Sequence, residues 1–279
     1  MIAVLGGLGA AVCWSAGTLS AARASRLIGA PRVLAWVMLV GLAVNAPLVI
    51  VSGLPEGLRG GRIVWFAVAG AANVGGLLLA YDALRIGKVS IVAPITSTEG
   101  AIAALIAVVA GESLRLGSAF VLGAIAVGVV LASRTPSDRP SHPLRATLFA
   151  AGAALSFGVG LYATGRISMS LPIVWAMLPP RLVGTAVVAA PALARGRLRI
   201  VPAVIPFVVL SGLCEIGGFA SYAVGARHSI AISAVLASQF AALAAVAAYF
   251  LLKERLTRVQ VGGIVVVVAG VALLSALQA

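Results

Sequence analysis

Long apolar segments are the feature that most constrains this chain. A helix needs about 20 apolar residues to cross roughly 30 Å of hydrocarbon at about 1.5 Å per residue. Segments of that kind follow one another along the 279 residues, of which 62% are hydrophobic and only 10% charged. The mean hydropathy of +1.15 lies far outside the range of a soluble domain. We therefore predict an all-α polytopic membrane protein. Its ten expected spans are 2–22, 33–52, 63–84, 89–110, 117–133, 147–165, 172–191, 203–226, 230–252 and 258–277.

The connections between these spans are too short to hold a soluble domain or a nucleotide-binding module. The net charge of +13 comes from 20 Lys and Arg residues that are scattered over the loops, so we expect no nucleic-acid partner. Cys13 and Cys214 both fall inside spans and are expected to be packing residues, with no metal site and no cofactor. The first span lacks a basic segment before it, so we expect it to be retained and not cleaved as a signal peptide.

The chain repeats itself at an offset of 142 to 143 residues. Near the start of each half, Gly9 opens "GAAVCWSAG" and Gly152 opens "GAALSFGVG", which brings Trp14 over Phe157. A nearly constant offset over three separate stretches indicates an internal duplication. The other two matches place "NVGGLLLAYDALR" from Asn73 over "EIGGFASYAVGAR" from Glu215, and "GESLRLGSAFVLGAIAVGVVLAS" from Gly111 over "KERLTRVQVGGIVVVVAGVALLS" from Lys253.

Each repeat contains five spans, so the second copy must enter the membrane in the opposite sense to the first. This predicts two inverted five-helix repeats, related by a pseudo-two-fold axis in the membrane plane, with a site near the midplane. We expect the first repeat at 1–134 (helices 1–5), a polar, Pro-rich linker at 135–146, and the second repeat at 147–279 (helices 6–10).

These motifs resemble the drug/metabolite transporter superfamily, in its ten-helix EamA-type branch. The resemblance rests on "GESL" and "KERLT" before the final helix of each repeat, on the two opening motifs, and on "PPRLVG" with Arg181. It covers essentially the whole chain. It implies a proton-linked or exchange carrier, usually an exporter of amino acids, related metabolites or drugs, with a cavity shared by helices 1, 3, 4, 6, 8 and 9. The chain departs from the family pattern in having Lys253 before Glu254, and Glu99 where relatives commonly carry Pro.

Two carboxylates are expected near the middle of the membrane, Glu99 in the fourth span and Glu215 in the eighth. An acid at that depth costs about 2.5–3.5 kcal/mol unless it faces a wet cavity or a partner. We interpret both as coupling or substrate-binding residues, one from each repeat. They could bind and release protons, or attract the ammonium group of a substrate, and the residues alone leave both roles open.

Other intramembrane polar residues are candidates for the same site. Arg181 follows Pro179 and Pro180 at an expected kink, where it could be a counter-charge for a Glu or a substrate carboxylate, or a helix-packing residue. Asn73 occupies the repeat position of Glu215. Further candidates for the cavity wall are Trp14, Thr96, Tyr162, Tyr222, Ser238 and Gln239.

Structural roles are expected for a second group. Asp82 and Arg85 stand three residues apart and predict an interfacial ion pair or gate. Pro94 could break the fourth helix and open it toward the site. Glu112 and Glu254 at the repeat junctions are expected to cap helices and join the repeats.

The leading hypothesis is a secondary active transporter that exports a small metabolite (an amino acid or related zwitterion or cation) or a drug by proton coupling or exchange. An uncoupled facilitator, a lipid scramblase and a structural membrane protein are the alternatives. No catalytic motif is present, so we do not expect an enzyme. The expected location is the bacterial inner (plasma) membrane, as a monomer or homodimer.

The two arguments for membrane orientation disagree. Fourteen Lys and Arg residues fall on the side of loops 1–2, 3–4, 5–6, 7–8 and 9–10, and five on the other, with Arg181 excluded. The positive-inside rule then places both termini outside the cytoplasm, whereas the family resemblance implies the reverse. We favour the charge count.

Overall fold

The computed structural model describes residues 1–58, 62–86, 89–132, 143–252 and 257–278, and within these ranges all regular structure is helical. The helices are α1 (Ile2–Ile28), α2 (Ala30–Ser52), η1 (Glu56–Leu58), α3 (Arg62–Ile86), α4 (Val89–Thr96), α5 (Glu99–Val109), α6 (Leu116–Ala132), α7 (Pro143–Ser168), α8 (Ile173–Gly184), the π-helical η2 (Thr185–Ala189), α9 (Ala190–Ala194), η3 (Pro202–Val204), α10 (Ile205–Ala226), α11 (Ile230–Ala237), α12 (Phe240–Leu252) and α13 (Arg258–Gln278).

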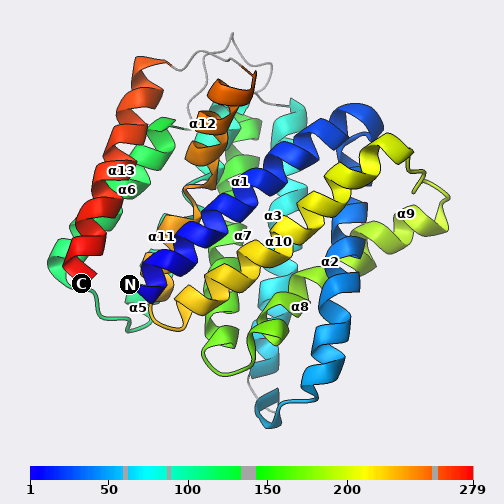
Figure 1. The fold of residues 1–279 in the computed structure, drawn as a ribbon, viewed down its shortest axis with the longest axis horizontal. Helices are drawn as coiled ribbons and strands as arrows, with labels where there is room; N and C mark the ends of the chain where they lie inside the picture. Colours follow the sequence, from blue (N-terminus) through cyan, green and yellow to red (C-terminus); the bar gives the residue numbers. More distant parts are fainter. Residues whose placement is uncertain (59–61, 87–88, 133–142, 253–256, 279) are drawn as a thin grey trace.

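These helices form ten membrane crossings. Seven segments are long and apolar enough to span a bilayer, and three shorter apolar helices at 116–132, 230–244 and 258–274 supply the rest in the described residues. The fourth crossing joins α4 and α5, the seventh joins α8, η2 and α9, and the ninth joins α11 and α12. The predicted all-α fold with ten spans is confirmed. Both chain ends lie at the same end of the bundle (Figure 1), as an even number of crossings requires.

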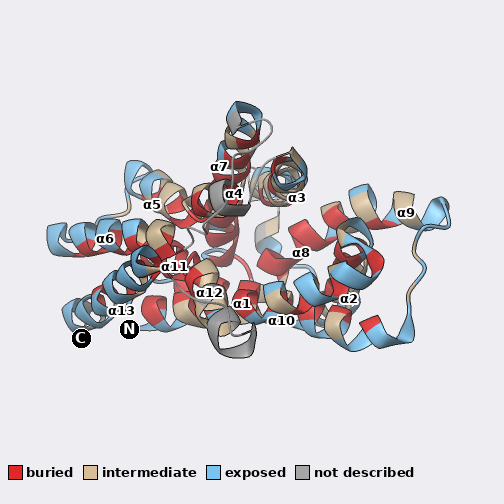
Figure 2. Cartoon of the chain, turned by 90° about the horizontal axis from the view of Figure 1, so that it is seen from above, coloured by how far each residue is buried: buried red, intermediate tan, exposed pale blue. Residues whose placement is uncertain are grey.

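The packing of the helices follows the repeat. α1 packs along α10, and their repeat partners α7 and α3 pack along each other in the same way. The contact of α2 with α10 corresponds to that of α8 with α3. The contact of α5 with α7 corresponds to that of α12 with α1, and the contact of α4 with α7 to that of α11 with α1. Two further pairs, α2 with α8 and α6 with α13, join repeat partners directly, and the contact of α5 with α11 joins the fourth crossing to the ninth. Seen from above, α1 and α10 form one side of the centre and α3 and α7 the other (Figure 2). This pattern of exchange is the pseudo-two-fold symmetry of an inverted repeat.

Single contacts between α2 and α8 obey the same symmetry. A β-carbon added at Gly41 would stand 2.8 Å from the Arg181 side chain, and one at Gly184 would stand 2.5 Å from the Met38 sulfur. Gly41 and Gly184 lie 143 positions apart, as do Met38 and Arg181. Each helix therefore places one long side chain across a glycine of its partner, and only the second repeat places a charge there.

The fourth and ninth crossings are each broken near their middle. α4 ends at Thr96 and α5 begins at Glu99, while α11 ends at Ala237 and α12 begins at Phe240. Two residues separate the pieces in each repeat, at positions that correspond at an offset of 141. Secondary transporters build their midplane sites from such discontinuous helices.

Hydroxyl groups satisfy backbone carbonyls at both breaks. Ser97 Oγ donates to the carbonyl of Pro94 at 2.9 Å, and the repeat-related Ser238 Oγ donates to the carbonyl of Val235 at 2.8 Å. In a membrane interior, such carbonyls need a partner because water is absent. Pro94 itself lies inside α4, so the break predicted there falls a few residues later.

The two broken crossings meet at Gly100. A β-carbon at this residue would stand 2.3 Å from the carbonyl oxygen of Ala234 in α11 and 2.6 Å from the hydroxyl of Ser238. Only glycine allows this approach of α5 to α11. The contact therefore fixes how the two breaks face each other.

Polar side chains cross-link the end of the bundle where α1 begins. Ser221 Oγ donates to the carbonyl of Gly6 at 2.9 Å, and Ser233 Oγ donates to the carbonyl of Ala3 at 3.0 Å. The guanidinium of Arg227 donates to the carbonyl of Ser168, the last residue of α7, at 2.7 Å and to the carbonyl of Leu171 just after that helix at 2.8 Å. These bonds tie α1, α7, α10 and α11 together at that end.

Candidate functional site

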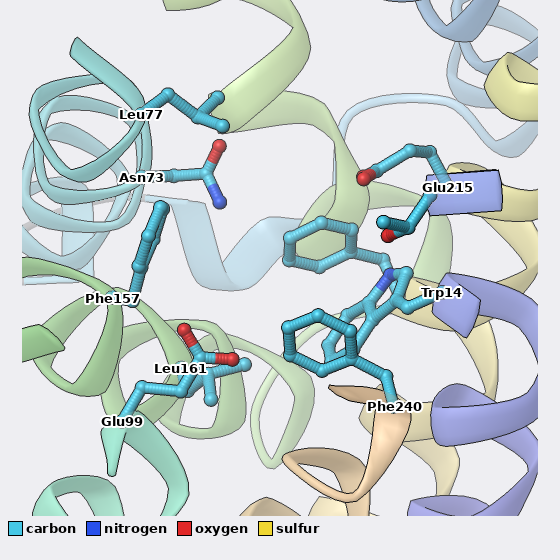
Figure 3. Close-up of a pocket in the computed structure, with 10 residues that line it drawn as sticks. Trp14, Asn73, Leu77, Glu99, Phe157, Leu161, Glu215 and Phe240 are labelled. Carbon is cyan, nitrogen blue, oxygen red and sulfur yellow. The ribbon is translucent and has the colours of Figure 1, made fainter. Parts of the chain in front are cut away.

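A cavity of about 180 Å³ lies at the centre of the bundle, between the α1/α10 and α3/α7 pairs. Figure 3 shows Glu99, Asn73 and Phe157 on one side and Glu215, Trp14 and Phe240 on the other. The cavity is lined by Trp14, Thr18, Asn73, Leu77, Glu99, Phe157, Leu161, Glu215, Phe219 and Phe240.

The ten lining residues form five pairs related by the repeat. Four helices each supply two residues spaced four apart, which lie on one helix face, and the fifth pair comes from the first residues after the two helix breaks. The pseudo-two-fold axis therefore passes through the cavity. The pairs are Trp14 with Phe157, Thr18 with Leu161, Asn73 with Glu215, Leu77 with Phe219, and Glu99 with Phe240.

Charge breaks this symmetry in the second repeat. Arg181 Nη2 stands 2.9 Å from Glu215 Oε2 and is fully buried, whereas the Glu215 side chain keeps 34% exposure. The guanidinium also lies over the Phe219 ring at 5.1 Å and 3.6 Å from the Met38 sulfur. In the first repeat the corresponding positions are held by the neutral Met38 and Asn73. Glu215 is thus neutralised by a cation of its own repeat.

Glu99 has no such partner. It is the first residue of α5 and is only 7% exposed. Within the described part of the chain its carboxyl makes no hydrogen bond or ion pair. The helix N-terminus favours a negative charge by about 0.3–1 kcal/mol, less than the cost of about 2.5–3.5 kcal/mol for a carboxylate at this depth. The charged form therefore requires neutralisation by a proton or a cation.

Aromatic rings surround the space between the two carboxyl groups. Trp14 meets Phe219 edge to face at 5.2 Å between centroids and Phe240 at 6.4 Å. Gly218 and Gly76 allow the rings to lie against the helices, because a β-carbon would stand 2.3 Å from the indole of Trp14 and 2.6 Å from the ring of Phe157, respectively. The aromatic surface of the cavity thus depends on a pair of repeat-related glycines.

Four of the predicted site residues line the cavity, namely Trp14, Asn73, Glu99 and Glu215. Arg181 lies behind the wall, in contact with Glu215. The remaining candidates lie in the surrounding protein.

Hydroxyl groups expected at the cavity bond to the backbone instead. Thr96 Oγ1 donates to the carbonyl of Val92 at 3.0 Å, and Tyr222 OH donates across to the carbonyl of Leu161 at 2.9 Å. Ser238 bonds within its own helix break, as described above.

Tyr162 and Gln239 are also buried outside the wall of the cavity. The Tyr162 ring meets Trp65 edge to face at 5.6 Å. Gln239 is buried beside Ser238, and its side-chain nitrogen has no partner among the described residues.

The predicted junction and gate residues lie away from the cavity. Glu112 accepts hydrogen bonds from the Ser229 hydroxyl and from the backbone N–H groups of Ile230 at 3.1 Å and Ala231 at 3.3 Å, at the N-terminus of α11. Asp82 and Arg85 form an exposed pair at 3.6 Å.

Glu254 lies outside the described residues. No group of three or more His, Cys, Asp or Glu side chains that could hold a metal ion occurs in the ranges that the structure covers.

Sequence reasoning missed six lining residues: Thr18, Leu77, Phe157, Leu161, Phe219 and Phe240. A signal for most of them was present, because four stand one helical turn after another lining residue and Phe157 is the repeat partner of Trp14. Phe240 carries no such signal, since its place depends on where the ninth crossing breaks.

The fold and the cavity define a polytopic membrane protein with the inverted-repeat organisation of secondary transporters. The sequence model of the EamA-like transporter family matches residues 1–134 and 144–276. The chain therefore belongs to the EamA-like transporter family, and it is a multi-pass membrane transporter of small substrates.

A solved crystal structure gives independent support for the fold. It aligns with 99% of this chain and 97% of its own, with a TM-score of 0.82 and 19% sequence identity. A search of the curated proteins found no match.

Proposed function

We propose that this protein is a proton-coupled or exchange carrier that binds its substrate in the central cavity and moves it by alternating access. The observation that carries the proposal is the carboxyl of Glu99, which is buried at a helix break on the wall of that cavity and has no partner among the residues that the structure describes. A group that must be neutralised, and that faces the substrate space, can exchange a proton for a substrate. Glu215 is less suited to this because Arg181 already neutralises it.

The two repeats provide the means of alternation. In the present arrangement, bonds from Ser221, Ser233 and Arg227 tie the helices at the end where α1 begins. Because inverted repeats can exchange conformations, the same helices can open there and close at the other end around a fixed site. From the family, we also propose that the direction of transport is export and that the location is the bacterial inner membrane.

The domain boundaries stay part of this proposal. We propose repeats at 1–134 and 147–279, with 135–146 between them, most of which lies outside the described residues. On this division each repeat contributes five of the ten lining residues.

Transport in proteoliposomes tests the proposal. The purified protein is reconstituted with a pH-sensitive dye inside, and amino acids, polyamines and quaternary ammonium compounds are added outside. We expect saturable proton movement with at least one compound, and its loss in Glu99→Gln. Saturable solute flux that does not depend on the pH gradient would show that the protein is an uncoupled facilitator. Lipid translocation without saturable solute binding would show a scramblase.

A further inference from the structure

We propose that the cavity selects small organic cations with an apolar or aromatic body, and discriminates against zwitterions and anions. This inference rests on the proposed function in one respect, that the central cavity is the substrate site. It narrows the substrate to one charge class.

The charges that face the cavity carry the first step. Glu99 and Glu215 are its charged lining residues, and no Lys, Arg or His side chain lines it among the residues that the structure describes. The Arg181–Glu215 pair is neutral as a unit. An ionised Glu99 therefore leaves the site with a single negative charge, which a monocation balances and which a zwitterion or anion does not.

Arg181 is not available to a substrate carboxylate. Its side chain has no exposed surface, and Glu215 at 2.9 Å, Phe219 and Met38 occupy its guanidinium. The aliphatic part of the Arg181 side chain packs closely against Gly41. A carboxylate could reach it only by displacing Glu215, which would then be left with no counter-charge. An amino acid would bring its carboxylate between two acids with no cation to receive it.

The aromatic walls carry the second step. Rings from both repeats line the cavity, Trp14 and Phe219 on one side of the axis and Phe157 on the other, together with Phe240 after the second break. The faces of aromatic rings attract cations within about 6 Å, and more strongly where water is excluded. The same rings offer apolar surface to the body of the ligand.

The size of the cavity bounds the ligand. Its volume of about 180 Å³ falls below the range of roughly 300–1,000 Å³ for sites that hold drug-sized molecules. A dry apolar cavity of roughly 150 Å³ accommodates benzene. A single ring with a short aminoalkyl arm therefore fits, and a multi-ring drug does not fit this conformation.

Four probes that share a phenyl ring on a two-carbon chain and differ in charge test the inference. They are phenethylamine (cation), phenethyl alcohol (neutral), phenylalanine (zwitterion) and hydrocinnamate (anion). Binding to the purified protein in detergent is measured by calorimetry and by thermal shift at neutral pH. We expect phenethylamine to bind about tenfold or more tightly than phenethyl alcohol, and phenylalanine and hydrocinnamate to bind no more tightly than the alcohol.

Variants assign the selectivity to Glu99. In Glu99→Gln the preference of the site for phenethylamine over phenethyl alcohol should disappear, while Glu99→Asp should keep it and so control for folding. Glu56→Gln removes an exposed acid on η1 that does not line the cavity and should change nothing.

Three results would overturn the inference: binding that ignores charge, tighter binding of phenylalanine or hydrocinnamate, or no binding of any probe. None of these results would refute the proposed carrier function, because a compound of another class could still drive proton movement in the proteoliposomes. Conversely, cation-selective binding without any transport would refute the carrier and leave the charge preference standing.

Discussion

Arg181→Met and Glu215→Asn would replace the intramembrane ion pair by the residues of the first repeat, because Met38 and Asn73 occupy the corresponding positions. The first repeat thus carries neutral residues at both of these positions. Made singly and together, the two substitutions form a double-mutant cycle that measures how strongly the pair is coupled.

The structure sets the expected magnitudes. Removing one partner of a buried pair costs about 3–5 kcal/mol. Glu215→Asn should reach that range, since Arg181 has no exposed surface and its Nε already lacks a partner among the described residues. Arg181→Met should cost less, about 2–3 kcal/mol, because the 34% exposure of Glu215 lets the cavity hydrate it. The double variant should lie within about 1 kcal/mol of the wild type, since a neutral pair replaces both charges.

Thermal unfolding in detergent, followed by tryptophan fluorescence, provides the assay. At about 2 °C per kcal/mol for a chain of this size, Arg181→Met should lower the midpoint by about 5 °C and Glu215→Asn by about 8 °C, with the double variant within about 2 °C of the wild type. If the effects of the two single variants simply add in the double variant, within about 0.5 kcal/mol, the pair is not coupled and the neutralisation of Glu215 by Arg181 is wrong.

Two further predictions concern packing and capping. Gly100→Ala should destabilise the protein by about 1–3 kcal/mol through overpacking, since its β-carbon would meet the Ala234 carbonyl at 2.3 Å. Gly75→Ala, with nothing within 4 Å, is the matched control and should be neutral or stabilising by up to about 1 kcal/mol. Equal thermal midpoints for the two variants would refute the tight crossing. Glu112→Gln should lower stability by about 1–2 kcal/mol, because an amide nitrogen cannot accept hydrogen bonds from the N–H groups of α11 as the carboxylate does. The control is Glu56→Gln, at an exposed position on η1, which should change the thermal midpoint little. A similar loss of stability in both variants would argue against a specific cap.

The spans and the repeat could be predicted because both depend only on the residue types and their positions along the sequence. Runs of about 20 apolar residues have few alternatives to a membrane helix, and a fixed offset pairs Asn73 with Glu215 without knowledge of the packing. Some of the residues that line the cavity could be predicted for the same reason. Once Asn73 and Glu215 are paired across an axis, the residues one turn further along the same helices lie beside them.

The remaining features depend on contacts that local sequence does not encode. Thr96 and Ser238 were expected at the cavity because they are polar, but hydroxyl groups in apolar surroundings bond to their own helix carbonyls. The pairing of Arg181 with Glu215 depends on how α8 crosses α10, and a sequence separation of 34 positions does not fix that crossing. The place of Phe240 depends on the exact register of a helix break.

The binding of phenyltrimethylammonium as a function of pH tests the central claim most directly, because the charge of this cation does not titrate. Only the ionised form of Glu99 attracts it, so the cation and the proton compete for one site and each weakens the binding of the other. We predict that affinity rises with pH by up to about tenfold per pH unit while Glu99 titrates, that binding releases a proton into a lightly buffered solution, and that Glu99→Gln abolishes both effects. An affinity that does not vary with pH, or a pH dependence that survives in Glu99→Gln, would contradict the account.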